Sequence, residues 1–322
     1  MPWWQIVLIA LAAYCILLLI CSLISFQGAL RRRRPRKKHA PNRLWRNHLP
    51  TLQQGMDWFF SQPFESLELE RCGFLLRGRY LPRKGSHKTA VLLHGYRGEG
   101  RERMVDGRFY YENGFNLFLP DLRSHGSSGG AYIGMGCGDR GDIPAWLALL
   151  EERYGPAAFV LDGVSMGAAT VLSLSGDSDL PSSVKALVAN CAFTSVYEEF
   201  DHVLRRLPRL IRRPLLLFSG LWSRLLAGYS FRRETPVEQA ARASCPILFL
   251  HGEEDTFVPY SMMERLYAAY GGEKTMVSVP DAAHALSFIT HRDLCERALA
   301  EFLQSTGLLS REGPLYFSPA GH

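Results

Sequence analysis

The five residues Gly163 to Gly167 constrain the fold of this chain more than any other stretch. They read Gly-Val-Ser-Met-Gly and lie between the apolar run Ala157 to Leu161 and the small-residue run Ala168 to Leu172. A buried strand, a tight turn and a helix of small residues form the strand-to-helix elbow that exposes a serine. The turn is so sharp that a side chain at either glycine would collide with the neighbouring strand or helix. The pattern therefore predicts that Ser165 is a nucleophile at a helix N-terminus, where the unpaired N–H of Met166 favours negative charge.

Short, continuous apolar runs recur from Thr89 onward, and a helical stretch follows most of them. Such runs are typical of strands buried on both faces, and therefore of a parallel sheet covered by helices. The runs are Ala90 to Leu93, Phe115 to Leu119, Ala157 to Leu161, Val184 to Ala189, Ile247 to Leu250 and Thr275 to Val279. The expected helices are Arg101 to Glu112, Asp139 to Tyr154, Ser165 to Ser175, Tyr260 to Tyr270 and Ser287 to Gln304.

Upstream of these runs the pattern is different. Thr51 to Ser61 predicts a short helix, while Glu65 to Glu70 and Gly73 to Leu81 predict an antiparallel hairpin at a sheet edge. The chain of 322 residues has room for one α/β domain of about 250 residues and an extension. We place this domain at residues 51–304, with an eight-stranded, mostly parallel sheet flanked by helices. The tail, residues 305–322, has no periodicity and is expected to be loosely ordered.

The extension is apolar at the N-terminus. No charged residue occurs from Ile6 to Ile24, a length that matches the hydrocarbon core of a bilayer, and Trp3 and Trp4 are suited to its interface. Residues 1–30 are therefore interpreted as a transmembrane anchor. A cleaved signal peptide is the alternative, but no basic residue precedes the apolar run and no small-x-small cleavage site follows it.

A basic segment follows the apolar run. Residues 31–50, interpreted as a juxtamembrane linker, contain all nine Lys and Arg of the first fifty residues, which contain no acid. The net charge of +6 is thus a property of this segment, since the remaining 28 basic and 31 acidic residues sum to −3. The charges predict a single-pass protein of the cell membrane with a cytoplasmic domain. A solvated tail or a nucleic-acid patch is the alternative, but contact with anionic lipid explains the position better, and we expect no nucleic-acid partner.

The seven cysteines show neither a disulfide framework nor a CxxC metal spacing. His94 has no second ligand at a metal-like spacing, so we expect it to brace a loop. We therefore expect no metal and no cofactor.

A serine nucleophile needs an imidazole that takes its proton and a carboxylate that orients the imidazole. Asp255 follows the strand that ends at Leu250, and His284 follows the strand that ends at Val279. The order Ser165, Asp255, His284 is the order that an elbow of this type requires. Glu253 and Glu254 compete with Asp255, whereas His251 and His291 are interpreted as structural residues.

An oxyanion formed at Ser165 needs two backbone donors. Met166 supplies one, and the glycine-containing loop His94 to Gly98 after a buried strand predicts Tyr96 as the other. Asp121, Arg123, His125 and Gly126 follow the next strand and are expected to brace the site.

One insertion, at about residues 195–235, interrupts the alternation of strands and helices. It combines eight arginines with many leucines, and we interpret it as a helical lid over the carboxyl end of the sheet. The alternatives are a packed cap that does not move and a segment that lies on lipid headgroups.

Together these motifs resemble the α/β-hydrolase superfamily, close to membrane-anchored bacterial hydrolases of the serine aminopeptidase-like and Bem46-like group. The matching stretches span about residues 55–304 and are His94 to Gly98, Asp121 to Gly126, Tyr132 to Gly136, Gly163 to Thr170, His251 to Asp255 and Ala283 to Ala285. The resemblance implies an α/β-hydrolase fold and a Ser-His-Asp triad, but no substrate. Relatives often have a different residue at Asp162, where an acid would bear on the polarity of the pocket or on the pKa of His284.

The sequence thus predicts a serine hydrolase that cleaves a small-molecule or lipid-derived acyl ester through a covalent acyl-enzyme. A serine peptidase or thioesterase on the same triad is the alternative, and a membrane-tethered scaffold without turnover is the alternative from another class.

Overall fold

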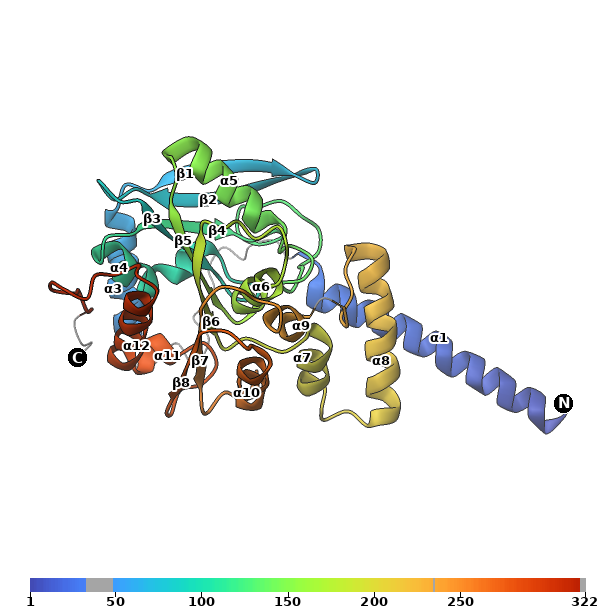
Figure 1. Ribbon diagram of the computed structural model, residues 1–322. Helices are drawn as coiled ribbons and strands as arrows, with labels where there is room; N and C mark the ends of the chain where they lie inside the picture. The colour runs from blue at the N-terminus through green and yellow to red at the C-terminus, as the bar shows by residue number, and fades with distance from the viewer. Residues whose placement is uncertain (33–48, 234, 319–322) are drawn as a thin grey trace.

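The computed structural model describes residues 1–32, 49–233 and 235–318. Within them eight strands form one sheet in the order β1-β2-β4-β3-β5-β6-β7-β8 (Figure 1). Only β2 runs antiparallel to its neighbours β1 and β4, and all other pairs are parallel. The strands are β1 Glu65–Arg71, β2 Phe74–Leu81, β3 Lys88–Leu93, β4 Asn116–Asp121, β5 Ala158–Val164, β6 Val184–Asn190, β7 Ile247–Gly252 and β8 Lys274–Val279. The predicted mostly parallel sheet and its edge hairpin are confirmed.

Helices cover both faces of the sheet (Figure 1). One face carries α3 Leu49–Ser61, η1 Gly100–Arg103, α4 Met104–Glu112, α11 Ser287–Thr290 and α12 Arg292–Ser305. The other face carries α5 Asp142–Tyr154, α6 Met166–Ser175, α9 Pro236–Ala240 and α10 Tyr260–Ala269. The central strands β3 to β7 are buried almost throughout, which explains why their sequences are continuous apolar runs.

The structure differs from the sequence-based expectation at two helices and at the tail. The helix predicted from Ser287 to Gln304 is broken at His291, whose φ of −128° and ψ of 58° are not helical. The first turn of the helix predicted from Arg101 is the 3₁₀ turn η1. The tail is not loose up to residue 318: Leu308 and Leu309 are buried against the sheet, and Glu296 accepts a hydrogen bond from the N–H of Ser318. A segment without periodicity can still pack against the domain, and hydrophobic periodicity in the sequence does not predict such packing.

The insertion, here called the cap (residues 195–235), contains α7 Val196–Val203, α8 Arg209–Trp222 and one π-helical turn, η2 Ser223–Ala227. Ser195 begins α7 with a side chain that accepts a hydrogen bond from the N–H of Glu198. Pro208 precedes α8, and Gly228 in the left-handed conformation follows η2. The cap is therefore a helical insertion, as the sequence predicts.

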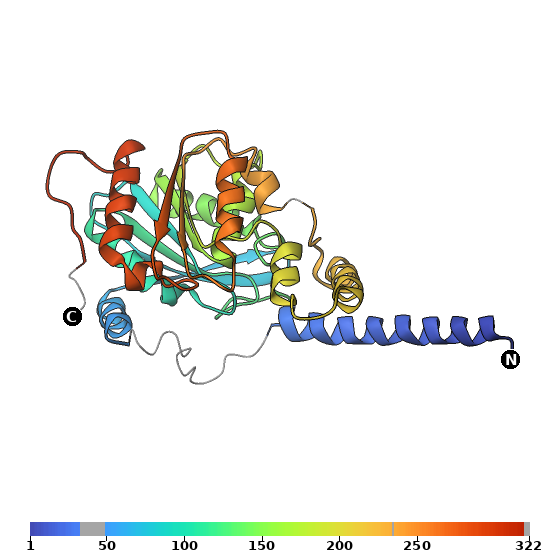
Figure 2. The ribbon, with the colours of Figure 1, turned by 90° about the horizontal axis from the view of Figure 1, so that it is seen from below.

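The N-terminal helix α1, Trp3–Leu30, projects away from the domain (Figure 2). It is long and apolar enough to cross a membrane, which is consistent with a single-pass anchor or a signal sequence. Its last turns enter the domain: Phe26 and Leu30 are buried in the core, and the N–H of Ile133 donates to the carbonyl of Leu30. The N–H of Arg32 donates to Ala131, so the first residues of the predicted linker belong to this docked segment. Residues 33–48, with the rest of the basic run, lie outside the described residues.

Candidate active site

The elbow between β5 and α6 has the geometry that its sequence predicts. Ser165 has φ 54° and ψ −115°, a conformation that L-residues rarely adopt. A Cβ on Gly163 would lie 2.2 Å from the carbonyl carbon of Gly167, and one on Gly167 would lie 2.3 Å from the carbonyl oxygen of Leu93. Both glycines are therefore required because backbone passes where a side chain would lie.

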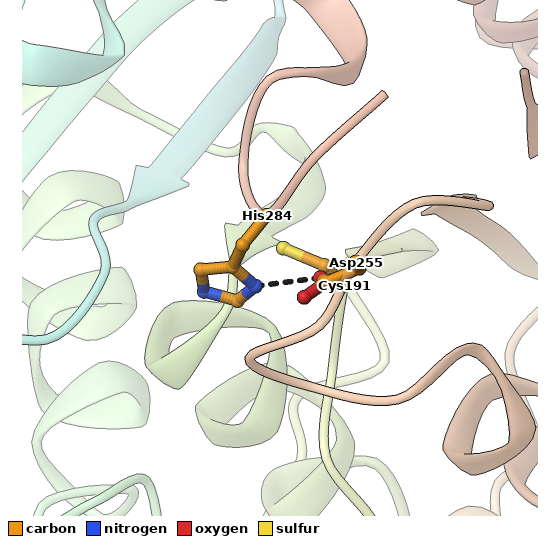
Figure 3. Close-up of side chains that lie close together, drawn as sticks. All are labelled: Cys191, Asp255 and His284. Carbon is orange, nitrogen blue, oxygen red and sulfur yellow. Dashed lines mark hydrogen bonds and ion pairs between the residues drawn. The ribbon is translucent and has the colours of Figure 1, made fainter. Parts of the chain in front are cut away.

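Three side chains from distant parts of the chain meet at this elbow. The Nε2 atom of His284 lies 2.9 Å from Ser165 Oγ, and its Nδ1 lies 2.6 Å from Asp255 Oδ2. In the neutral imidazole, Nδ1–H donates to Asp255, and this leaves Nε2 free to accept the serine hydroxyl proton. Figure 3 shows His284 and Asp255 facing each other with Cys191 beside them. The structure thus brings together the three residues predicted from the sequence.

Asp255 is held by its own loop. Its Oδ1 accepts the N–H groups of Phe257 and Val258 at 2.9 and 2.8 Å. The buried His251 donates from Nε2 to the carbonyl of Val258, and the same nitrogen lies 3.3 Å from Asp255 Oδ2. Burial raises the pKa of Asp255, but the hydrogen bonds from His251 and His284 outweigh it and lower the pKa to about 2. Asp255 is therefore an anion at neutral pH.

The contact between His251 and Asp255 was missed by the sequence reasoning, which treated His251 as structural only. The spacing of four residues in one strand-to-loop segment was the available signal. His251 is a positioning residue, since it touches Asp255 and not the serine.

Cys191 is a second contact that the sequence did not reveal. It follows β6 with φ 48°, and its sulfur lies beside the imidazole of His284. Burial lowers the pKa of His284, but Cys191 and Asp255 raise it by more, so this pKa stands well above 6.5.

Sγ of Cys191, a carboxylate oxygen of Asp255 and a ring nitrogen of His284 lie within 4.8 Å of one another, a spacing that could hold a metal ion. Both ring nitrogens of His284 already have protein partners, however. A metal would have to displace one of these hydrogen bonds, so the cluster fits a proton relay better than a metal centre.

Glu199 on α7 is a third residue that the sequence reasoning missed. It is buried, and within the described part of the chain neither carboxylate oxygen has a hydrogen-bond partner. Burial raises its pKa to about 8, with smaller effects from His284 and Asp255 of opposite sign. A carboxyl group with this pKa is mostly neutral at pH 7. No periodicity distinguishes Glu199 from its neighbour Glu198, which pairs with Arg265 on the surface.

The loop after β3, which contains Tyr96, lies against the elbow. A Cβ on Gly95 would lie 3.6 Å from the Cβ of Ser165. His94 braces this loop as expected, since its Nε2 accepts the N–H of Leu122 and its Nδ1 contacts the carbonyl of Gly95 at 2.8 Å. Asp121 braces the next loop by accepting the N–H groups of Gly100 and Ser127. The oxyanion role of Tyr96 and Met166 stays a prediction.

Asp162 lies next to the elbow in sequence but points away from the triad. Its carboxylate accepts Arg103 Nη2 at 2.8 Å and the hydroxyl of Tyr110 at 2.9 Å. Arg103 also donates to the carbonyl of Leu93 and so links the elbow strand to the loop that carries Tyr96. Arg103 and Tyr110 thus engage the carboxylate of Asp162, and its effect on the pocket or on the pKa of His284 stays a prediction.

The site reaches the surface. Ser165 is 6% exposed, whereas the side chain of His284 is 19% exposed. Phe257, 44% exposed, packs its ring 4.9 Å from the imidazole. The imidazole of His284 is thus partly open to solvent, whereas Ser165 is nearly buried beneath it.

Comparisons with known proteins agree with this geometry. A profile described as the alpha/beta hydrolase fold matches residues 91–228, and one described as TAP-like protein matches residues 219–313. The chain belongs to the α/β-hydrolase superfamily. Within it, the chain groups with proteins such as YqkD of Bacillus subtilis, which is 28% identical over 75% of this chain and 82% of its own length.

Two further relatives of this α/β-hydrolase are eukaryotic. The protein bem46 of Schizosaccharomyces pombe is 24% identical over 78% of this chain and 76% of its own length. The lysophosphatidylserine lipase ABHD12 of Danio rerio is 26% identical over 60% of this chain and 50% of its own length. Among solved structures, the Pyrococcus furiosus esterase Pf2001 superimposes with a TM-score of 0.64 and 20% identity, covering 85% of this chain and 98% of the esterase. This last likeness establishes the α/β-hydrolase fold.

Proposed function

We propose that this chain is a membrane-anchored serine hydrolase that cleaves acyl esters. The observation that carries the proposal is the hydrogen-bonded line from Ser165 through His284 to Asp255, with distances of 2.9 and 2.6 Å. Three polar residues from three separate loops meet in this order because a nucleophile needs a base and the base needs an orienting anion.

In the proposed reaction Ser165 Oγ attacks the ester carbonyl while His284 Nε2 takes its proton. The N–H groups of Tyr96 and Met166 stabilise the negative oxygen of the tetrahedral intermediate. His284 then returns the proton to the leaving alcohol oxygen, which leaves an acyl-serine. Water attacks this ester with His284 as the base, and the acid and free Ser165 are released. The negative charge on the substrate oxygen and the positive charge on His284 are both stabilised by groups of the chain itself, so the mechanism requires no cofactor.

The docked end of α1 supports retention of the N-terminal helix as a single-pass anchor. Removal of residues 1–30 as a signal sequence would remove Phe26 and Leu30 from the core, together with the backbone hydrogen bond from Ile133 to Leu30. Burial of one large apolar side chain contributes about 1.5–3 kcal/mol. The end of α1 is therefore part of the fold, which favours retention of the helix as an anchor. The basic residues that follow it favour a cytoplasmic domain at the cell membrane.

The end of α1 also contacts the loop beside the serine. The hydroxyl of Tyr96 donates to the carbonyl of Ala29 at 2.5 Å, and Arg97 donates to the carbonyl of Gly28 at 2.7 Å. A spanning helix attached at this loop holds the site close to the bilayer surface. This favours a lipid-derived acyl substrate over a polar peptide, in line with the lipase name of the Danio rerio relative. Peptidase or thioesterase activity on the same triad remains the alternative.

The test is a panel of acyl esters of graded chain length, with acyl thioesters and aminoacyl amides alongside, hydrolysed by the full chain in detergent. We expect kcat/KM to be highest for esters and to rise with acyl length. Ser165→Ala is the blank, and its activity should equal the uncatalysed rate. Faster hydrolysis of amides would assign a peptidase, and no Ser165-dependent hydrolysis of any substrate by folded protein would indicate a scaffold.

A further inference from the structure

The cap helix α8 exposes a stripe of large apolar side chains. Leu215 and Leu216 face the domain and are buried. The opposite face exposes Leu210 by 82%, Leu217 by 63% and Leu221 by 44%, and Leu225 of the following turn is 64% exposed. Residues 210, 217 and 221 recur at helical spacing, so they form one continuous face. A contiguous apolar face of this kind marks a binding surface.

This face lies beside the proposed membrane span. Figure 1 shows α8 crossing α1, and three hydrogen bonds join the helices: Tyr14 to the carbonyl of Leu210, Trp222 to the hydroxyl of Ser22, and Ser219 to the carbonyl of Ser22. The N-terminal part of α1 carries exposed apolar residues on all sides, among them Ile9, Leu11 and Ile16. The exposed face of α8 therefore begins, at Leu210, beside the apolar surface of α1.

The depth of this contact follows from helix geometry. A hydrocarbon core of about 30 Å needs about twenty helical residues, and counted from Trp3 these end at Ser22. The bonds to α8 begin at Tyr14 and end at Ser22, so α8 meets α1 over about the last 12 Å of the span, on the side next to the domain. An amphipathic helix at this depth lies in the boundary between headgroups and acyl chains.

A groove beside the stripe has the chemistry of an anionic headgroup site. It measures about 530 Å³ and is lined by Tyr197, Arg213, Pro214, Leu217, Phe218 and Arg232. The guanidinium of Arg232 lies 3.7 Å from the centre of the Tyr197 ring. In residues 1–32, 49–233 and 235–318 no carboxylate forms an ion pair with Arg213 or Arg232. Two arginines without acidic partners, next to an apolar floor, match a phosphate joined to acyl chains.

We propose that α8 is a second membrane contact, which inserts Leu210, Leu217 and Leu221 into the bilayer boundary and binds the phosphate of an anionic phospholipid between Arg213 and Arg232. The proposal rests on the membrane anchoring by α1 but not on the chemistry at Ser165. It makes the cap a fixed, lipid-bound wall of the site.

The experiment uses the full chain in nanodiscs of phosphatidylcholine with or without phosphatidylglycerol. A photoreactive benzoylphenylalanine replaces Leu217 or, as the matched control, Leu294, which is 40% exposed on α12. After irradiation, lipid adducts are quantified by mass spectrometry. We expect adducts at position 217 and none at 294. Equal yields at the two positions, or no adduct at 217, would overturn the insertion of α8.

Charge reversal tests the headgroup site in the same nanodiscs. Arg213→Glu with Arg232→Glu should reduce phosphatidylglycerol adducts at position 217 by about tenfold and leave phosphatidylcholine adducts unchanged. The control pair Arg297→Glu with Arg311→Glu, elsewhere on the domain, should change neither. Unchanged phosphatidylglycerol adducts in the first pair would overturn the headgroup site.

Co-elution with nanodiscs and hydrolysis of a soluble short-chain ester are measured for every variant. If the wild-type chain did not elute with the nanodiscs, both the membrane anchor and this proposal would be contradicted. Loss of ester hydrolysis would contradict the proposed chemistry alone.

Discussion

The carboxyl edge of the sheet and the cap differ in whether their polar and apolar side chains find partners within the chain. At the edge, Ser165, Asp255 and His284 bond to one another and to backbone groups, and glycines allow the loops to touch. In the cap, the leucine stripe of α8 faces outward, and among the described residues Arg213 and Arg232 form no ion pair with an acid. The groups at the edge thus satisfy one another within the chain, whereas the cap leaves a surface that we propose the bilayer covers. The predictions below sharpen or break this contrast.

The largest expected effect is on turnover at the edge. His284→Ala should reduce kcat for a short soluble ester by about a millionfold, because the serine loses its base. The cap substitution Leu221→Ser should leave the same kcat within about twofold. Both variants should unfold at the wild-type temperature in differential scanning fluorimetry. Comparable losses of kcat in the two variants would erase the contrast.

Removing an ion pair should also cost more stability beside the elbow than in the cap. Arg103→Met leaves the buried Asp162 unpaired and should lower the free energy of unfolding by about 3–5 kcal/mol. In the cap, Arg212 pairs with the partly exposed Asp201 at 2.8 Å, and Arg212→Met should cost about 1 kcal/mol or less. Denaturant titration of the two variants measures both values, and a larger loss for the Arg212 variant would contradict the account.

Adding a methyl group at a glycine should be harmful at the elbow and harmless in α1. Gly163→Ala should destabilise the domain by about 3 kcal/mol or more and abolish activity, since its Cβ would lie 2.2 Å from backbone. Gly28→Ala in α1 meets nothing within 4 Å and should stabilise that helix slightly. Thermal unfolding and ester hydrolysis of both variants decide the matter. An active Gly163→Ala enzyme would mean that the elbow is less tight than described.

Glu199 belongs to the cap but lies near His284 and Asp255, and its raised pKa should make the stability depend on pH. Burial raises this pKa from 4.5 to about 8, so between these pH values the unfolded state is ionised while the folded state keeps its proton. The stability that this group contributes is complete below pH 4.5 and is lost as pH rises to about 8. Glu199→Gln removes this loss. The melting temperature of the variant relative to wild type should therefore increase across this pH window, and a constant difference would refute the burial of an unpaired carboxyl.

The smallest effect concerns Cys191. Its contact helps to raise the pKa of His284, and the base works only when neutral. Cys191→Ala should therefore lower that pKa and move the acid limb of the kcat/KM profile to lower pH. The control Cys295→Ala, at a buried cysteine of α12, should not move it. If the wild type and both variants gave the same pH profile, Cys191 would have no effect on the pKa of His284.

Local sequence rules predicted the parts of the molecule that short-range geometry determines. The spacing of Gly163 and Gly167 predicted the elbow, and the positions of Asp255 and His284 after their strands predicted two further members of the cluster. The contact of Cys191 with His284 depends on packing between segments far apart in the chain. No periodicity encodes such a contact.

The docking of α1 was hidden for a related reason. A helix that is apolar all round has no distinct face, so its pattern could not reveal that Ser22, Phe26 and Leu30 are buried while Ile9 and Ile16 are exposed. The tail near Leu308 is aperiodic and gave no signal of its packing.

The central claim, that Ser165 is an activated nucleophile, is tested most directly by a fluorophosphonate probe on the full chain, followed by mass spectrometry of the labelled peptide. The account predicts one adduct, on Ser165, in the wild type, and a strongly reduced labelling rate in His284→Ala. Labelling at another residue, or equal rates in the two proteins, would contradict it.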